Sequence, residues 1–189
     1  MAVTAVTGDI GAGKSTFAKL LAEKLNCELL DADKTAKNLW TRDDIKKIAV
    51  ARWGVEISDE KGNLILKKIS EHVFSDKNEN KFCNSMLHPL VIAELEEKAS
   101  KLKNCVIEIP LLFEAEANRP KWIDKVIYVT ADFEIRAQRC LEQRGWSVDE
   151  LMKRESLLLP QRERIAVCEY VIHNDGEVSE LERLLAELT

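Results

Sequence analysis

Residues 8–15 of the chain read Gly-Asp-Ile-Gly-Ala-Gly-Lys-Ser, which fits the pattern G-x-x-x-x-G-K-[ST]. The run Ala2–Val6 before this stretch is short, with small and branched side chains, and predicts a strand. After it, Phe17, Leu21 and Leu25 recur at helical spacing and predict an amphipathic helix. A strand, a glycine-rich turn and a helix in this order predict a phosphate-binding loop, and the alternative is a glycine-rich turn that binds nothing.

The residue types of this loop explain how it would hold phosphate groups. Successive backbone N–H groups at the start of a helix attract anions, and glycines let the backbone pass close to the ligand. Lys14 can bridge the β- and γ-phosphates of a nucleoside triphosphate, and the Ser15 hydroxyl can ligate Mg²⁺. The residues expected to bind the nucleotide here are Gly11, Ala12, Gly13, Lys14, Ser15 and Thr16.

The rest of the chain alternates short strand-like runs with longer helical patterns, which predicts an α/β fold with a parallel sheet. We expect a three-layer α/β/α architecture around a five-stranded sheet. The five expected strands are Ala2–Val6, Cys27–Leu30, Val106–Ile109, Val126–Val129 and Tyr170–Ile172.

Two helical segments interrupt this alternation. Residues 34–103 are almost entirely helical in pattern, which is more than one crossover helix requires, and residues 133–160 form a second, charged excursion. In the first segment Pro89 predicts the first turn of a helix, and in the second Ser147 and Glu150 predict a capping box. The remaining residues, about 1–33, 104–132 and 161–189, are expected to form the core of a single domain.

Composition excludes several classes of protein. The chain has 189 residues, 46% of them hydrophobic, and its net charge of −5 argues against a nucleic-acid or anionic-membrane partner. The longest run without a charged side chain covers residues 82–93 only, too short to cross a membrane. No basic residue precedes Lys14, so no secretory signal is expected and we expect a cytoplasmic protein. Five scattered cysteines and three scattered histidines predict reduced thiols and no metal centre built by the protein alone.

Phosphate-binding loops occur in GTPases, ATPases and kinases, and other features separate these classes. The sequence contains no N-K-x-D element to read guanine. Glu108 lies inside an apolar run and close before Pro110, which is ambiguous for Mg²⁺ binding and poor for activating a hydrolytic water. A small chain with two helical excursions favours a phosphoryl-transfer kinase, with an acceptor-binding subdomain at about 34–103 and a lid at about 133–160. An ATPase that couples hydrolysis to conformational change is the alternative.

Two carboxylates follow the second expected strand. Asp31 and Asp33 lie at its carboxyl end, the edge of a parallel sheet where ligands bind. They could accept the proton of an acceptor hydroxyl group and order the shell of Mg²⁺. Asp33 is equally a candidate N-cap for the helix that follows, and the two roles are compatible.

Further short motifs follow in order along nearly the whole chain. They are Asp31-Ala-Asp33, Gly62-Asn-Leu64 leading to Phe74, Leu87-His-Pro-Leu90, Ile109-Pro-Leu-Leu-Phe-Glu114, Gln138 to Arg144, and Val171-Ile-His-Asn174. Together with the phosphate-binding loop, these motifs resemble the dephospho-coenzyme A (dephospho-CoA) kinase family. The resemblance implies ATP-dependent phosphorylation of the ribose 3′-hydroxyl of dephospho-CoA, the final step of CoA biosynthesis. Another small-molecule or nucleotide kinase with the same loop is the alternative.

The resemblance also implies catalytic roles. Asp33 would be the general base, and Lys14 with the lid arginine Arg144 would offset the charge that develops on the transferring phosphoryl group. Ser15 and Asp31 would hold Mg²⁺. The implied partners are ATP, Mg²⁺ and dephospho-CoA, with no nucleic acid and no membrane, and the chain would be a monomer or a weak homo-oligomer.

Binding roles outside the loop are implied in the same way. Arg139 and Asn174 would contact ATP, the latter largely through its backbone. Each of these roles has an alternative. Arg139 and Arg144 could be solvated surface residues, and His88 could simply occupy the first turn of a helix. Residues 111–113 could serve only to pack the core. Lys67 stands where the family commonly has an arginine. The residues implied to bind the acceptor are Asp33, His88, Leu111, Leu112, Phe113 and Lys67.

Overall fold

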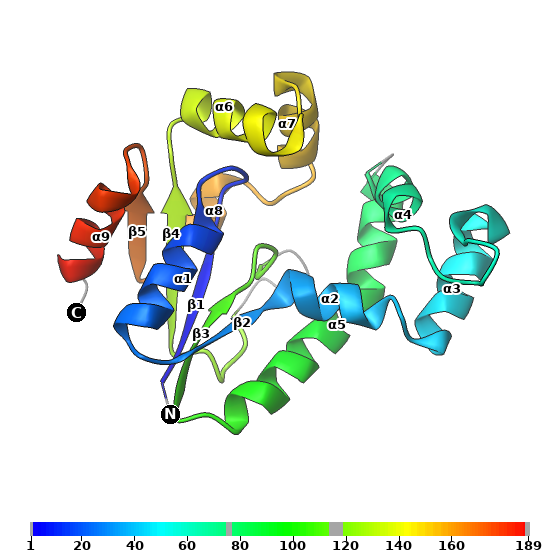
Figure 1. Ribbon diagram of the computed structural model, residues 1–189, viewed down its shortest axis with the longest axis horizontal. Coiled ribbons are helices and arrows are strands. Elements are labelled where there is room, and N and C mark those ends of the chain that lie inside the picture. The colour runs from blue at the N-terminus through cyan, green and yellow to red at the C-terminus, as the bar shows by residue number, and fades with distance from the viewer. Residues whose placement is uncertain (1, 75–76, 114–118, 188–189) are drawn as a thin grey trace. The chain divides into compact units, whose positions relative to one another are not determined.

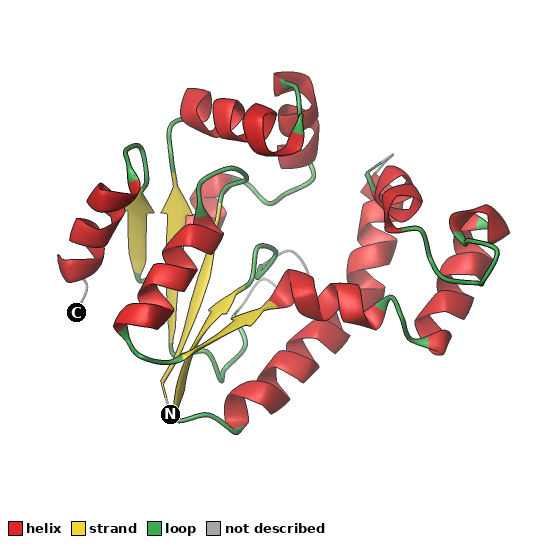
Figure 2. Cartoon of the chain, viewed as in Figure 1, coloured by secondary structure: helices red, strands yellow, loops and turns green. Residues whose placement is uncertain are grey.

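The computed structural model describes residues 2–74, 77–113 and 119–187 of the chain. Within these residues five strands form one sheet, in which every neighbouring pair is parallel and the order is β2-β3-β1-β4-β5 (Figures 1 and 2). The predicted α/β fold with a five-stranded parallel sheet is therefore confirmed. The strands are β1 (Ala2–Gly8), β2 (Glu28–Asp31), β3 (Asn104–Glu108), β4 (Lys125–Thr130) and β5 (Tyr170–His173).

Helices occupy the connections between the strands. One helix, α1, connects β1 to β2, whereas α2 to α5 and the short 3-10 helix η1 lie between β2 and β3. Helices α6 to α8 lie between β4 and β5, and α9 follows β5. Their bounds are α1 (Lys14–Lys24), α2 (Ala32–Leu39), α3 (Asp43–Trp53), η1 (Val55–Ile57), α4 (Leu66–Val73), α5 (Lys77–Ser100), α6 (Phe133–Arg144), α7 (Val148–Glu155), α8 (Gln161–Ile165) and α9 (Val178–Glu187).

The chain divides into two compact units, Met1–Asp31 with Glu96–Thr189, and Ala32–Leu95. The first unit contains the whole sheet together with residues 8–15. The second contains α2, α3, α4 and most of α5. The predicted bounds of the core, the acceptor-binding subdomain and the lid stay predictions.

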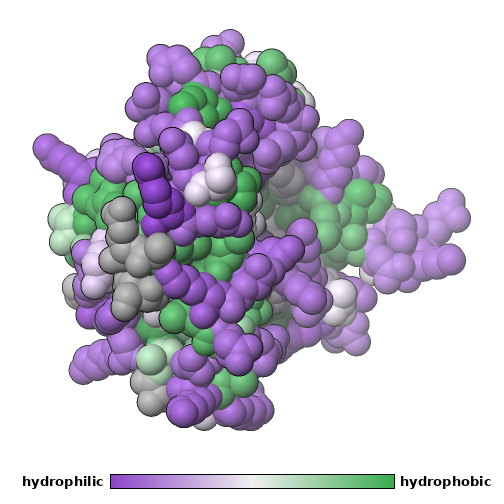
Figure 3. Space-filling model, turned by 60° about the vertical axis from the view of Figure 1, so that its left-hand side comes forward, coloured by the Kyte–Doolittle hydropathy of each residue, from purple (hydrophilic) through white to green (hydrophobic). Residues whose placement is uncertain are grey.

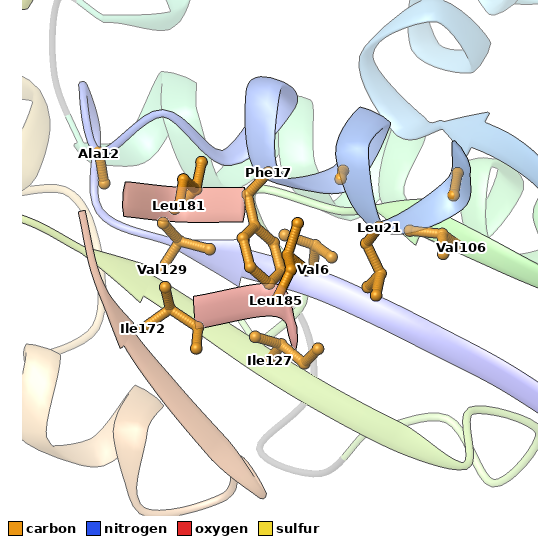
Figure 4. Packing of buried hydrophobic residues seen from close by; sticks show 12 residues of the cluster. Val6, Ala12, Phe17, Leu21, Val106, Ile127, Val129, Ile172, Leu181 and Leu185 are labelled. Carbon is orange, nitrogen blue, oxygen red and sulfur yellow. The ribbon is translucent and has the colours of Figure 1, made fainter. Parts of the chain in front are cut away.

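The core of the first unit lies between the sheet and two helices. Phe17 and Leu21 on α1 and Leu185 on α9 pack with Val6 and Val129 of the sheet (Figure 4). Phe17 is fully buried, and burial of a side chain of this size stabilises the fold by about 1.5–3 kcal/mol. Helices α1 and α9 therefore cover one face of the sheet.

The second unit is held by an aromatic cluster. The Trp53 ring stacks on His72 with a centroid distance of 5.9 Å and meets the Phe82 ring edge-on at 5.6 Å. The Trp53 indole N–H donates a hydrogen bond of 2.7 Å to Glu79 Oε2. Arg52 donates two hydrogen bonds to the same carboxylate. Contacts between α3, α4 and α5 thus give this unit a core of its own.

The predicted helix start at Pro89 is wrong. Helix α5 begins twelve positions earlier, at Lys77, and runs through Pro89 without ending. Proline inside a helix costs about 3 kcal/mol because it lacks the N–H donor. The buried side chains Leu87, Val91 and Leu95 form one face on both sides of Pro89, and burial of that continuous face compensates for the missing hydrogen bond.

Of the capping box predicted in the second helical segment, the Ser147 N-cap is confirmed, whereas the Glu150 carboxylate accepts a hydrogen bond of 2.6 Å from Arg154 Nε. Ser147 is the N-cap of α7, and its hydroxyl oxygen accepts a hydrogen bond of 3.2 Å from the backbone N–H of Glu150. This contact satisfies one of the N–H groups that a helix leaves unpaired at its start. The local sequence therefore determines where α7 begins.

One face of the molecule is mainly polar. The face seen in Figure 3 is largely hydrophilic, and its exposed hydrophobic residues form separate patches. Among the described residues, no helix combines the length and the apolar character needed to span a bilayer. The cysteines are all free, and burial raises the pKa of the Cys83 and Cys168 thiols to about 12, which keeps them protonated.

Candidate active site

The phosphate-binding loop lies between the end of β1 and the start of α1. Gly13 is the N-cap of α1 and has a φ of 82°, so the helix starts without a side-chain cap. The N–H groups of the first helical turn point along the helix axis and carry a partial positive charge. The loop therefore ends at a helix start that favours an anion.

Close packing explains two of the loop glycines. Gly8 has a φ of 141°, and a Cβ atom there would lie 1.9 Å from the carbonyl oxygen of Val129 on β4. Gly11 has a φ of 76°, and a Cβ atom there would lie 2.7 Å from the carbonyl oxygen of Arg136 on α6. Both neighbours are backbone atoms that cannot easily move. The loop thus needs glycine at these positions to lie between β4 and α6.

Lys14 bends back over the loop. Its ammonium group donates a hydrogen bond of 2.7 Å to the carbonyl oxygen of Asp9. That carbonyl also accepts the backbone N–H of Ala12 at 3.3 Å. The lysine charge is therefore held within the loop, beside the backbone of Asp9 and Ala12.

Oxygen-bearing side chains lie at the carboxyl edge of the sheet next to the loop. The Ser15 hydroxyl donates a hydrogen bond of 2.7 Å to Glu108 Oε1. Glu108 is the last residue of β3, and its neighbour across the strand pair is Asp31, the last residue of β2. The structure therefore brings Ser15 next to Glu108, and Glu108 next to Asp31. The sequence left Glu108 ambiguous, although an acidic residue in an otherwise apolar strand was a signal for it.

The loop after β5 is attached to the phosphate-binding loop. The side-chain amide of Asn174 donates a hydrogen bond of 2.8 Å to the carbonyl oxygen of Ala12. Arg139 on α6 donates to the carbonyl oxygens of Asn174 and Gly176, at 2.8 and 3.2 Å. Two sequence-predicted residues, Arg139 and Asn174, are thus brought together here. The Arg139 guanidinium fixes the backbone of the loop that begins at Asn174.

Other arginines of the second helical segment were missed in the sequence. Arg136 is buried and donates to the carbonyl oxygen of Ile10 in the phosphate-binding loop, at 3.2 Å, and to Glu155 on α7. The Arg144 and Arg154 guanidinium groups lie 4.8 and 3.9 Å from the centre of the Trp146 ring. Only Arg144 of this pair was predicted as a site residue. Spacing alone does not separate these arginines, because the segment contains several.

The residues predicted on the acceptor side differ in exposure. In the first unit, Leu112 and Phe113 are buried in the core, whereas Leu111 is half-buried. In the second unit, Asp33 lies exposed in the first turn of α2, where the helix dipole favours a carboxylate. His88 is half-buried on α5 and Lys67 is exposed on α4, whereas Glu114 lies outside the described residues.

A phosphate-binding loop at the carboxyl edge of a parallel sheet, flanked by arginine-bearing helices, is the arrangement of a P-loop kinase. Comparison with known proteins identifies the family within this class of kinases. A family model described as dephospho-CoA kinase matches residues 2–180. The chain therefore belongs to the dephospho-CoA kinase family.

Individual relatives agree with the family match. A dephospho-CoA kinase of Fusobacterium nucleatum is 34% identical over 182 residues, covering 95% of this chain and 92% of that protein. A crystal structure of a Thermus thermophilus protein has a TM-score of 0.75 and 32% identity, covering 100% of this chain and 98% of the other. The dephospho-CoA kinase of Campylobacter jejuni shares the fold, with a TM-score of 0.67 at 23% identity over 98% of this chain and 94% of the other.

Proposed function

We propose that this chain transfers the γ-phosphoryl group of ATP to the ribose 3′-hydroxyl group of dephospho-CoA, which yields CoA and ADP. The observation that carries the proposal is a phosphate-binding loop with Lys14 and Ser15 held in place, in a chain of the dephospho-CoA kinase family. Phosphoryl transfer depends mainly on positioning and on electrostatic stabilisation of the transferring group. The loop supplies both on the ATP side.

We propose further that Mg²⁺ accompanies ATP at the sheet edge. The hydroxyl of Ser15 and the carboxylates of Glu108 and Asp31 are hard oxygen ligands of the type that Mg²⁺ prefers. Among the described residues no group of three or more His, Cys, Asp or Glu could hold a metal alone, and Mg²⁺ commonly uses one or two carboxylates together with substrate phosphates. These residues therefore fit the ion. When bound, it would neutralise charge on the β- and γ-phosphate oxygens.

On the acceptor side we propose Asp33 as the general base. Its carboxylate is exposed and follows Asp31 by two residues along the chain. A carboxylate within about 3 Å of the acceptor hydroxyl group could accept its proton as the new P–O bond forms. His88 and Lys67 are proposed to bind the acceptor. Residues 111–113 are proposed to supply an apolar wall, for which the half-buried Leu111 is better placed than its two buried neighbours.

We assign residues 34–103 to acceptor binding and residues 133–160 to a lid. Arg144 is exposed on α6 and is proposed to offset charge on the phosphoryl group when the lid closes. Arg139 is proposed to serve ATP by holding the backbone at Asn174, which its two hydrogen bonds support. We further propose a cytoplasmic monomer or weak homo-oligomer whose partners are small molecules.

The experiment that tests the proposal measures ADP release from ATP with Mg²⁺, with and without dephospho-CoA. Expected is slow release without the acceptor, rapid release with it, and a product whose mass has risen by one phosphoryl group. Lys14→Ala protein, purified by the same procedure, controls for contaminating kinases. Activity on a different hydroxyl compound, but not on dephospho-CoA, would contradict the acceptor, and rapid release without any acceptor would favour an ATPase.

A further inference from the structure

A buried carboxylate lies inside the phosphate-binding loop. Asp9 is the second residue of the loop, and its side chain is 3% exposed. It accepts hydrogen bonds from the Tyr128 and Thr130 hydroxyl groups, both at 2.6 Å, and from the side-chain amide of Gln161 at 2.7 Å. Arg164 on α8 donates a fourth, from Nη2 at 3.0 Å. The carboxylate is therefore fully enclosed by donors from β4 and α8.

The backbone of Asp9 is held within the phosphate-binding loop by hydrogen bonds on both its N–H and its carbonyl oxygen. Its N–H donates to the carbonyl oxygen of Val129 at 3.0 Å, and its own carbonyl oxygen accepts the Lys14 ammonium group at 2.7 Å. The same residue therefore carries the buried carboxylate and accepts the hydrogen bond of the Lys14 ammonium group. A negative charge is consequently built into a loop whose ligand is itself strongly negative.

Arg164 supplies the opposite charge. It is 5% exposed, and it is fixed by a hydrogen bond of 3.0 Å from Nε to the carbonyl oxygen of Leu159 and by the Tyr128 ring, 5.4 Å from the guanidinium carbon. Burial alone would raise the pKa of Asp9, but its hydrogen bonds from Thr130, Tyr128 and Gln161 and the Arg164 charge hold that pKa below its ordinary value. The Asp9 carboxylate is therefore ionised at neutral pH.

We propose that Arg164 is a positioning residue that keeps the loop able to accept the phosphate groups of ATP, because it neutralises the Asp9 carboxylate. The proposal rests on the proposed function only in taking an adenine nucleotide as the ligand of the loop. A buried charge without its partner acts strongly on its surroundings, since little water screens it. Without Arg164, Asp9 would repel the nucleotide phosphates. Without both charges, that repulsion would disappear.

The test compares Arg164→Gln with the double variant Asp9→Asn/Arg164→Gln. Binding of ADP and of adenosine is measured by calorimetry on the intact protein without any acceptor. In the single variant ADP should bind about tenfold more weakly, whereas adenosine, which carries no phosphate, should stay within about twofold of the parent. In the double variant ADP affinity should return to within about threefold of the parent, because the uncompensated charge is gone.

Several results would overturn the proposal. They are unchanged ADP affinity in Arg164→Gln, an equal loss for adenosine, and no recovery in the double variant. If Arg164→Gln does not fold, the test uses Arg164→Lys and the double variant. Arg164→Lys keeps the positive charge, and the double variant removes both the positive and the negative charge. A tenfold loss of ADP affinity in either would contradict charge compensation. Failure of dephospho-CoA as acceptor would leave these binding results unaffected, so the two proposals fail separately.

Discussion

The ammonium group of Lys14 and the hydroxyl group of Ser15 are both held by hydrogen bonds, to the Asp9 carbonyl oxygen and to Glu108. Long side chains lose conformational freedom when they bind a ligand, and this loss weakens binding. Here part of that ordering has already taken place within the loop. A preorganised charge stabilises the transferring phosphoryl group more than one that must first be positioned.

Replacement of Lys14 tests this role directly. Lys14→Ala is expected to lower the rate of phosphoryl transfer by more than about tenfold, because the charge beside the β- and γ-phosphates is lost. The rate is measured as acceptor-dependent ADP release. Lys19→Ala is the matched control, since Lys19 is exposed on the same helix and forms an ion pair with Glu23 at 3.9 Å. Near-normal turnover of Lys14→Ala would contradict the role of the loop in transfer.

Asp33→Asn separates proton transfer from nucleotide binding. A general base acts in the transfer step, so kcat should fall by about 10²-fold or more while ATP affinity stays within about twofold. Steady-state kinetics and ATP titration give the two quantities. Asp43→Asn is the control, because Asp43 is a similarly exposed carboxylate in the first turn of α3. A collapse of ATP binding in Asp33→Asn would instead assign Asp33 to the metal.

Among the helices and strands, those with a local signal were predicted and those that depend on distant burial were not. The sheet was predictable because its strands are apolar runs that end in glycine or a polar residue, as Ala2–Gly8 and Glu28–Asp31 do. Helix α5 was not, because Pro89 normally marks a helix start. The buried face of α5 on both sides of Pro89 is stabilised by packing against residues distant in the sequence, which a short window of sequence does not reveal.

Helix α7 gives a measurable case of a local signal. Ser147→Ala removes the acceptor for the Glu150 N–H and should lower the free energy of unfolding by about 1 kcal/mol. For a chain of this size the midpoint of thermal unfolding should fall by about 2–4 °C. Ser156→Ala is the control, because Ser156 follows the end of the same helix and makes no N-cap contact. Equal shifts in the two variants would contradict the capping role.

For the whole molecule, the charges buried beneath the phosphate-binding loop connect stability to pH. The pKa of Asp9 in the folded state lies below its ordinary value of 3.8. The unfolded chain therefore takes up a proton first as the pH falls, and acid favours unfolding. The stability that Asp9 contributes is complete above about pH 5 and is lost progressively as the pH falls through about 4 toward the folded-state pKa.

Denaturant unfolding between pH 3 and pH 7 measures this dependence. The free energy of unfolding of the parent protein should decrease below about pH 4, and Asp9→Asn should show a shallower decrease over the same range. Asp43→Asn again serves as control, because Asp43 is highly exposed. Identical pH profiles for Asp9→Asn and the parent would contradict a lowered pKa of Asp9 in the folded state.

The part of the site formed by distant contacts could not be predicted from the sequence. The loop motif located Lys14 and Ser15 because its residues are adjacent in the chain. The hydrogen-bond partners of Asp9 are separated from it by 119, 121, 152 and 155 positions, and no local pattern relates them. The partner of Ser15 is 93 positions away. Only the folded sheet brings these residues together.

The pairing of Asp9 with Arg164 also bears on how this sequence can diverge. A buried carboxylate at the second loop position destabilises the protein unless a buried cation pairs with it, and the same holds for the cation without the carboxylate. Single replacements at either position would therefore be disfavoured, whereas paired replacements would survive. Among descendants of a common ancestor, the residues at these two positions should be inherited together, so that lineages with a neutral residue at one lack the charge at the other.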